Sequence, residues 1–332
     1  MPSPRSARLT ARFLIASATP EAPAPSALRA LFPELTADPE LRVRAKRFLD
    51  TGDLPLLGPP LPSPSIWTEP LRACAGLESE VARALDAPFH RLVEARPSRA
   101  SLPANLQAVR LFARAVATAV DGVLADLDSG QVLGAEPEPS GFVLAHGWVG
   151  VFISPDGDGL IRADTAGLHR FGLPEISARS APLGHIHLAA NLVRGLAYRL
   201  ATVHHPTLRT LDDHPSAGSV TPLPGPLTRC ATTDVLRFWG LPTALGPSVI
   251  VRLIPATTPC PACETALEAV PPTAVPRPSG GEPRPRRSHR THIRPLSTNA
   301  SRCPPCPGVH PLRPTHQPPR PRPLPYTSRP PL

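Results

Sequence analysis

The stretch LGHIHLAANLVRGLAYRLATV, residues 183–203, decides the fold class, because it carries the clearest helical periodicity in the chain. Its large apolar side chains recur at close to four-residue spacing: Leu188, Leu192, Leu196, Leu200 and Val203. This spacing gathers them on one face of an α-helix that packs against a core. Arg194 and Arg199 fall outside the stripe and are predicted to face solvent, and Pro206 ends the helix because proline lacks the amide hydrogen.

Working outward from this helix, the sequence alternates helical and strand patterns between residues 11 and 255. Helices are predicted at 28–35, from Thr68 to Leu85 with Thr68 as the N-cap, and at 101–120, where Arg110 and Arg114 lie opposite the apolar stripe. Strands are predicted at 9–16, 90–95, 123–127, 131–133, 142–153, 160–163 and 248–254. We therefore expect an α+β domain at 11–255, with a mixed or antiparallel sheet packed by two or three amphipathic helices. It forms either one body or two subdomains, 11–98 and 99–255.

Charge and proline are concentrated at the carboxyl end. The 332 residues carry 35 Lys+Arg against 26 Asp+Glu, and residues 271–332 alone hold 11 arginines, 19 prolines and one acid, Glu282. Such a segment buries too little apolar area to offset its ordering entropy. We expect a flexible arm at 1–10 and a disordered Pro/Arg-rich tail at 256–332. An alternative interpretation is that the tail arises from reading GC-rich coding DNA in a shifted frame.

The same distribution narrows the function classes. Residues outside the tail are nearly neutral, so a basic nucleic-acid-binding face on the domain is not expected, and weak polyanion binding would fall to the tail. The apolar run at 13–16 is shorter than a secretory signal needs, and no apolar run reaches the length of a membrane span. We expect a cytoplasmic protein without a membrane partner. Cys74 and Cys230 stand alone and are predicted to be buried thiols.

Two Cys-x-x-Cys pairs form the strongest metal pattern: Cys260 with Cys263, and Cys303 with Cys306. Four thiolates at this local spacing can hold zinc. The 39 residues between the pairs exceed the usual spacing, however, and prolines inside each pair restrict the turn. We keep these four cysteines as the metal candidates while expecting no metal site or cofactor.

Other chemical patterns have structural interpretations. His185 and His187 diverge on a helix, so we interpret them, with the histidines at 204, 205 and 214 and the aspartates at 212 and 213, as helix-end and loop residues. Asp156-Gly157-Asp158-Gly159 lacks the distal ligands of a calcium loop and is predicted to be a hairpin turn.

Residues 165–176, Thr-Ala-Gly-Leu-His-Arg-Phe-Gly-Leu-Pro-Glu-Ile, form the most distinctive segment of the chain. With 121–126 and the helix at 183–203, this segment resembles an uncharacterised bacterial α+β domain family, in which Thr-x-Gly-Leu and Phe-Gly-Leu-Pro-Glu segments precede a helix. The resemblance covers about residues 103–254. It implies an α+β fold and brings no catalytic residue or cofactor with it.

The residues of this segment also predict their own structure. Gly167 and Gly172 suit positive φ in a bent connection, and Pro174 directs the chain into a strand. The apolar residues between these glycines, Leu168 and Phe171, together with Leu173, are expected to fill the core.

Thr165, His169 and Glu175 are the polar residues at which a site is expected, if the domain has one there. The sequence contains no glycine-rich phosphate loop, Gly-x-Ser-x-Gly elbow or His-Glu-x-x-His helix. We therefore favour a non-enzymatic binding or accessory module whose partner is unknown, a protein being one candidate. The alternatives are an enzyme with its site near these three residues, and polyanion binding through the tail.

Overall fold

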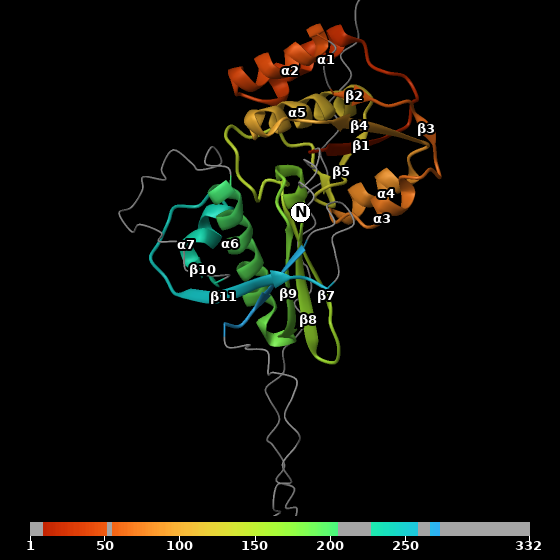
Figure 1. Cartoon of the computed structure of the whole chain (residues 1–332). Coiled ribbons are helices and arrows are strands. Elements are labelled where there is room, and N and C mark those ends of the chain that lie inside the picture. The colour runs from red at the N-terminus through yellow and green to blue at the C-terminus, as the bar shows by residue number, and fades with distance from the viewer. Residues whose placement is uncertain (1–8, 52–54, 205–226, 258–265, 273–332) are drawn as a thin grey trace, which may run out of the picture. The chain divides into compact units, whose positions relative to one another are not determined.

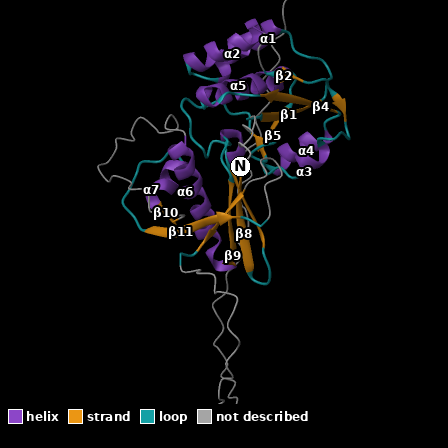
Figure 2. Cartoon of the chain, viewed as in Figure 1, coloured by secondary structure: helices purple, strands orange, loops and turns teal. Residues whose placement is uncertain are grey.

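The computed structural model describes residues 9–51, 55–204, 227–257 and 266–272. The chain divides into two compact units, 1–277 and 278–332, and every described element belongs to the first. The predicted α+β class is confirmed: helices pack on sheets that are antiparallel apart from one parallel pair (Figure 2). There are two six-stranded sheets in the described residues, where the sequence pattern suggested one.

The first sheet is antiparallel throughout and has β1 at its centre. Its strand order is β2-β4-β1-β5-β6, and β3 pairs with β4 beside β2. The strands are β1 (Ala11–Ser17), β2 (Leu56–Leu57), β3 (Leu61–Pro62), β4 (Phe89–Ala95), β5 (Val123–Asp126) and β6 (Gln131–Leu133). Prolines limit the segment between residues 55 and 66 to two short strands that pair only with β4, as expected for a chain short of amide donors.

Helices cover both faces of the first sheet (Figure 1). Phe13 and Ile15 of β1 belong to the core shared with α5 (Ala104–Ala119), on which α1 (Pro25–Leu35) and α2 (Pro39–Thr51) pack. Leu14 and Ala16 point to the opposite face, where α3 (Thr68–Arg72) and α4 (Glu78–Asp86) lie. Because successive strand residues alternate between faces, β1 is buried on both sides.

The second sheet is mixed and packs against α6 (Ile186–His204) and α7 (Thr232–Phe238). Its order is β10-β11-β12-β9-β8-β7, and only β12 and β9 run parallel. The strands are β7 (Gly150–Pro155), β8 (Leu160–Ala166), β9 (Glu175–Pro182), β10 (Leu227–Ala231), β11 (Ser248–Pro255) and β12 (Ala266–Val270). Three 3-10 turns complete the described elements: η1 (Arg99–Ser101), η2 (Leu168–Phe171) and η3 (Leu183–His185).

The single helix predicted from Thr68 to Leu85 is wrong, because the chain breaks into α3 and α4. Between them, Ala75 donates its N–H to the carbonyl of Gly130 at 2.8 Å and accepts the N–H of Val132 at 2.7 Å. Its backbone groups therefore extend β6 and cannot join a helical ladder. The N-cap of α3 is Trp67 rather than Thr68.

The buried strand predicted at 142–153 is a strand only from Gly150 onward, and there only Gly150 is buried. Residues 142–149 turn instead, with the N–H groups of Trp148 and Val149 both donated to the carbonyl of Leu144 and with Gly147 at φ +77°. Trp148 is fully buried. The apolar run therefore reflects burial of a compact turn, a case that a continuous apolar stretch does not distinguish from a strand.

The apolar stripe of α6 is rotated from its predicted face. Leu188 and Val203 are 67% and 60% exposed. The buried face carries Leu196, Tyr198 and seven smaller residues: Ala189, Ala190, Val193, Gly195, Ala197, Ala201 and Thr202. Small residues let the helix approach the second sheet closely. An added Cβ at Gly195 would lie 2.5 Å from the sulfur of Cys230 in β10.

The described fold extends past the boundary predicted at residue 255. β12 inserts between β11 and β9, so part of the segment assigned to the tail is a strand of the second sheet. Strands β4 and β5 both pair with β1, which joins the two segments considered as subdomains, 11–98 and 99–255. Of the arm predicted at 1–10, residues 1–8 lie outside the described residues, whereas Leu9 is buried in the core. Of the tail predicted at 256–332, residues 258–265 and 273–332 lie outside the described residues.

Candidate functional site

The structure brings the three predicted polar residues together around the Glu175 carboxylate. Oε2 of Glu175 accepts the Thr165 hydroxyl at 2.8 Å, and Oε1 accepts the backbone N–H groups of Gly167 and His169 at 2.9 and 3.1 Å. Nδ1 of His169 lies 2.8 Å from the same Oε1. The bend between β8 and β9 aims these donors inward, because Gly167 and Gly172 adopt the predicted positive φ, at +110° and +71°.

His169 also reaches the first sheet. Its Nε2 lies 3.3 Å from Oδ1 of Asp128, in the turn between β5 and β6. Arg12 of β1 donates two hydrogen bonds to that carboxylate, from its backbone N–H at 2.8 Å and from its Nε at 2.9 Å. His169 therefore lies between the carboxylate of Asp128 from the first sheet and that of Glu175 from the second.

A fully buried ion pair lies next to His169. Arg170 donates to both carboxylate oxygens of Asp126, one at 2.8 Å, and its NH2 group lies 3.8 Å from Asp128. The Asp126 carboxylate also accepts the backbone N–H groups of Asp128 and Ser129, each at 3.1 Å. We call the set Arg12, Asp126, Asp128, Thr165, His169, Arg170 and Glu175 the interior charge network.

Opposite charges in the interior charge network offset the cost of burying His169 and Asp128. Burial alone opposes the imidazolium, but the hydrogen bonds and charges of Asp128 and Glu175 raise the pKa of His169 to about 9. Burial also opposes ionisation of Asp128, yet His169, Arg170 and Arg12 lower the pKa of that carboxyl to about 2. At neutral pH His169 and Asp128 are therefore both charged, and their contact links the two sheets.

This arrangement predicts a loss of stability between about pH 6.5 and pH 9. The folded-state pKa of His169 exceeds the unfolded value of 6.5, so the folded state binds an extra proton in that window. Stability from the imidazolium is complete below the unfolded pKa and disappears as pH rises through 9, an effect on the order of 2–3 kcal/mol. Urea unfolding at pH 6 and pH 9.5 measures it.

His169→Gln is the control for this titration. We expect the variant to be less stable at pH 6 and to lack the decline across the same window. Equal declines in both proteins would show that another group carries the pH dependence.

Geometry does not give the interior charge network access to a substrate. Thr165 and Glu175 are 5% and 6% exposed, and all their side-chain oxygens are hydrogen-bonded within the chain. Neither of the two cavities described is lined by Thr165, His169 or Glu175. The side chains of Thr165, His169 and Glu175 do lie together, but they contact one another and line neither cavity.

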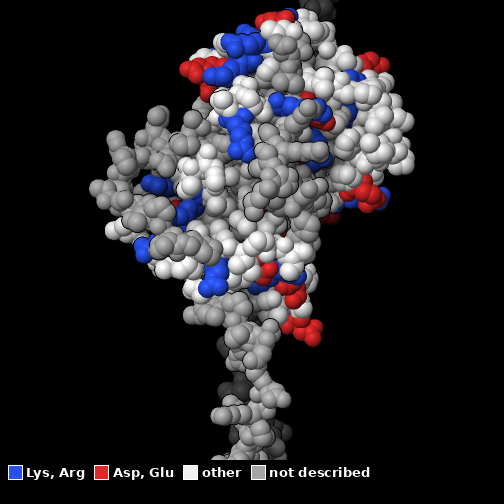
Figure 3. Space-filling view, viewed as in Figure 1, with Lys and Arg blue, Asp and Glu red and all other residues white. Residues whose placement is uncertain are grey.

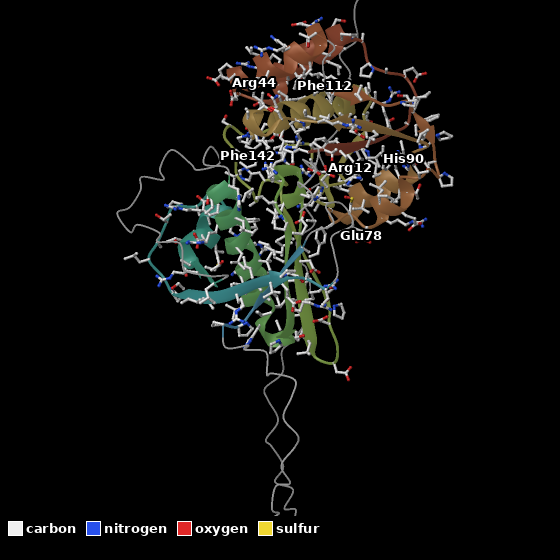
Figure 4. The ribbon with its side chains drawn as sticks, viewed as in Figure 1. Arg12, Arg44, Glu78, His90, Phe112 and Phe142 are labelled. Atoms are coloured by element: carbon white, nitrogen blue, oxygen red, sulfur yellow. The ribbon has the colours of Figure 1, made fainter. Side chains whose placement is uncertain are left out.

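A second buried cluster involves Arg110 and Arg114, because the face of α5 opposite the predicted apolar stripe is covered as well. The Arg110 side chain is 1% exposed, donates two hydrogen bonds of 2.9 Å to Glu138, and lies with its guanidinium 3.5 Å from the centre of the Trp148 ring. Arg114 shares the same carboxylate at 3.2 Å. Phe142, labelled in Figure 4, packs on Trp148 with ring centres 5.3 Å apart.

An open cavity of about 270 Å³ lies where β6, β7, α6 and the end of α7 meet. Its larger side chains are Gln131, Phe152, Arg194, Phe238 and Trp239, and its other described lining residues are alanine, glycine and valine. We call it the Trp239 cavity. A smaller cavity of about 180 Å³ lies at the carboxyl end of α5, beside Arg83, Arg114 and Thr118.

Arg194 belongs to the Trp239 cavity, which corrects the prediction that it faces solvent away from the domain. Its guanidinium carbon lies 5.0 Å from the centre of the Trp239 ring, and its NH1 donates to Oδ1 of Asn191 at 3.2 Å. Within the described residues no carboxylate lies within 4 Å of it. Burial lowers the pKa of Arg194.

The remaining sequence candidates gather no site in the described part of the chain. His185 and His187 are exposed, and no group of three potential ligands there could hold a metal. Cys260, Cys263, Cys303 and Cys306, like residues 205–214, lie outside the described residues. The Asp156 turn is a hairpin as predicted, its carboxylate accepting the N–H of Ser180 at 2.8 Å. Cys74 and Cys230 are buried, which raises their pKa values to about 11 and 12.

Comparison with known proteins gives no match: no protein-family model, curated protein or solved structure is similar to this chain. Among the described helices, none is long and apolar enough to cross a membrane. Any function must therefore be argued from the geometry above.

Local sequence patterns do not identify the partners of Thr165, His169 and Glu175. Asp126 falls inside the strand predicted at 123–127, and Asp128 lies just before the strand predicted at 131–133. One local signal exists, because Arg170 lies between Leu168 and Phe171, both predicted to fill the core. A buried arginine requires a carboxylate.

Proposed function

We propose that this protein is a non-catalytic ligand-binding module of the cytoplasm and that the Trp239 cavity is its binding site. The observation that carries the proposal is the composition of the cavity wall. Its described lining contains rings, small aliphatic residues, one amide and one guanidinium, and no aspartate, glutamate, histidine, cysteine, serine, threonine, tyrosine or lysine. Such a wall recognises a ligand, whereas acid–base or nucleophilic catalysis needs side chains of the types it lacks.

The location of the cavity also supports binding. It joins the outer strand of each sheet, β6 and β7, to α6 and α7. Phe238 is 2% exposed and fixes Trp239 by an edge-to-face contact with ring centres 5.7 Å apart. A ring held against rigid elements loses little conformational entropy when a ligand arrives.

The two alternative functions have weaker support. An enzyme centred on Thr165, His169 and Glu175 would need a substrate to displace hydrogen bonds in a buried network. Polyanion binding by the tail involves residues outside those described, and Figure 3 shows acidic and basic side chains interspersed on the visible face of the described residues. Membership of the bacterial α+β family remains a proposal carried by the segment at 165–176.

A fragment screen on the full-length chain tests the proposed binding site. We expect aromatic fragments, detected by saturation-transfer NMR, to bind the wild type. Ala145→Leu, which places extra methyl groups in the Trp239 cavity, should weaken them by about tenfold or more, because the added volume excludes the ligand.

Thr118→Leu is the matched control, because Thr118 lines the smaller cavity instead. It should leave fragment affinity unchanged. An absence of binding, or binding that Ala145→Leu does not weaken, would overturn the proposed function.

A further inference from the structure

The side chains that line the Trp239 cavity indicate a class of ligand. Arg194 determines the charge of that ligand, because it lacks a carboxylate partner among the described residues. Similarly placed arginines at the surface of the second sheet and on α6 have carboxylate partners: Arg162 with Asp164 at 2.6 Å, Arg179 with Asp156 at 3.1 Å, and Arg199 with Asp234 at 3.9 Å. Arg194, on the same helix as Arg199, has no such partner among the described residues. Its charge is half-buried, and among the described residues an amide oxygen and the face of a ring compensate it.

An anion would complete this environment. A guanidinium carries five N–H donors, of which one is donated to Asn191. Charge-assisted bonds to a carboxylate are stronger than bonds to neutral acceptors, and partial burial of the Arg194 guanidinium strengthens them further. The cavity therefore favours a ligand with one negative charge.

The other walls favour a flat ring. Phe152 and Trp239 line the cavity, and Trp239 is 43% exposed. Exposed indole is disfavoured in water and stacks on aromatic ligands in offset or edge-to-face geometry. The volume, about 270 Å³, lies just below the range of about 300–1,000 Å³ for drug-sized pockets, which limits the ligand to one or two fused rings.

We propose that the Trp239 cavity binds a planar aromatic or heteroaromatic carboxylate, with the Arg194 guanidinium pairing with the carboxylate and the Trp239 and Phe152 side chains contacting the ring. This assignment rests on the proposed function, since it names the ligand of the same site. Gln131 adds an amide to the lining of the same cavity, and its Nε2 would lie 3.1 Å from a Cβ added at Gly150. It is placed to bind a ring nitrogen or hydroxyl.

Three probes separate the contribution of the ligand's negative charge to binding from the contribution of its aromatic ring. Calorimetric titration of the full-length chain uses indole-3-carboxylate, the neutral indole-3-carboxamide and the non-aromatic cyclohexanecarboxylate. We expect indole-3-carboxylate to bind at least tenfold more tightly than either of the others, with an affinity that falls as salt rises.

Arg194→Gln tests the assigned residue, and Arg199→Gln is its matched control, with the same charge change on the same helix. Arg194→Gln should bring carboxylate and carboxamide affinities within about twofold of each other while carboxamide binding persists, and Arg199→Gln should keep the tenfold preference. Equal binding of the two probes by the wild type, or a preference that survives in Arg194→Gln, would overturn the assignment.

The outcomes distinguish this inference from the function on which it rests. Fragments that bind in the cavity without regard to charge would leave the binding module intact and remove the carboxylate assignment. Failure of every fragment class to bind there would remove both. The wild-type preference among the three probes decides the inference even if Arg194→Gln does not fold.

Discussion

Replacing Arg170 with methionine is expected to lower the free energy of unfolding by about 3–5 kcal/mol, the range for removing one member of a buried ion pair. Arg170 is 0% exposed and binds Asp126, which is equally buried, while Asp128 lies 3.8 Å away. Without the guanidinium, the buried carboxylates of Asp126 and Asp128 lose their nearest shared positive charge. Urea unfolding at pH 7 measures the loss.

A matched arginine on the neighbouring strand provides the control. Arg162 pairs with Asp164 at 2.6 Å, but their side chains are 35% and 32% exposed. Arg162→Met should therefore cost about 1 kcal/mol or less. Similar losses in the two variants would mean that burial does not govern the Arg170 pair.

A second substitution shows whether the loss comes from uncompensated charge. Asp126→Asn removes the negative charge while its amide oxygen can still accept the N–H groups of Asp128 and Ser129. We expect Arg170→Met with Asp126→Asn to be more stable than Arg170→Met alone. Additive losses would assign the effect to packing around Arg170 instead.

The contrast between these arginines also marks what the sequence can predict. Alternation, turn residues and glycine placement depend on neighbours along the chain, and they located β1, the β5–β6 hairpin and the bend with Gly167 and Gly172. Buried charge depends on partners far away in sequence. Arg170 and Asp126 are 44 residues apart, and Arg110 and Glu138 are 28 apart, so periodicity placed Arg110 opposite the apolar stripe without revealing its partner.

The same limit applies to α6 and to the Trp239 cavity. Hydrophobicity alone predicts that the leucines of α6 are buried. Close packing against β8 and β9 instead places the alanines on the buried face, so the buried face is rotated from the predicted one. Arg194 was assigned to solvent by the same rule. The cavity requires β6, β7, α6 and α7 to meet, and no pattern within one element reveals such a junction.

Gly167→Ala is expected to cost about 3 kcal/mol or more, because it combines backbone strain with a collision. Gly167 adopts φ +110°, and a Cβ there would lie 2.4 Å from the carbonyl oxygen of Trp148. A non-glycine residue in a left-handed conformation costs about 1–2 kcal/mol, and the contact adds to it because the obstructing atom belongs to the backbone. The carbonyl can retreat only by shifting the turn that carries the buried Trp148 ring.

Gly157→Ala separates the two contributions. Its φ of +119° imposes comparable strain, but an added Cβ would find its nearest heavy atom, in the Leu160 side chain, at 3.9 Å. We expect this variant to lose only about 1–2 kcal/mol. The difference between the two variants in urea unfolding measures the collision, and equal losses would contradict the close approach of Gly167 to Trp148.

The steric collision in Gly167→Ala should also weaken ligand binding in the Trp239 cavity, whereas the backbone strain in Gly157→Ala should not. Trp148 is followed by Val149 and Gly150, which line the Trp239 cavity, and the N–H of Gly167 is one of the donors that hold Glu175. Displacing this junction disturbs the interior charge network and the cavity wall together. Gly167→Ala should therefore weaken fragment binding at temperatures where the protein is still folded, and Gly157→Ala should preserve it.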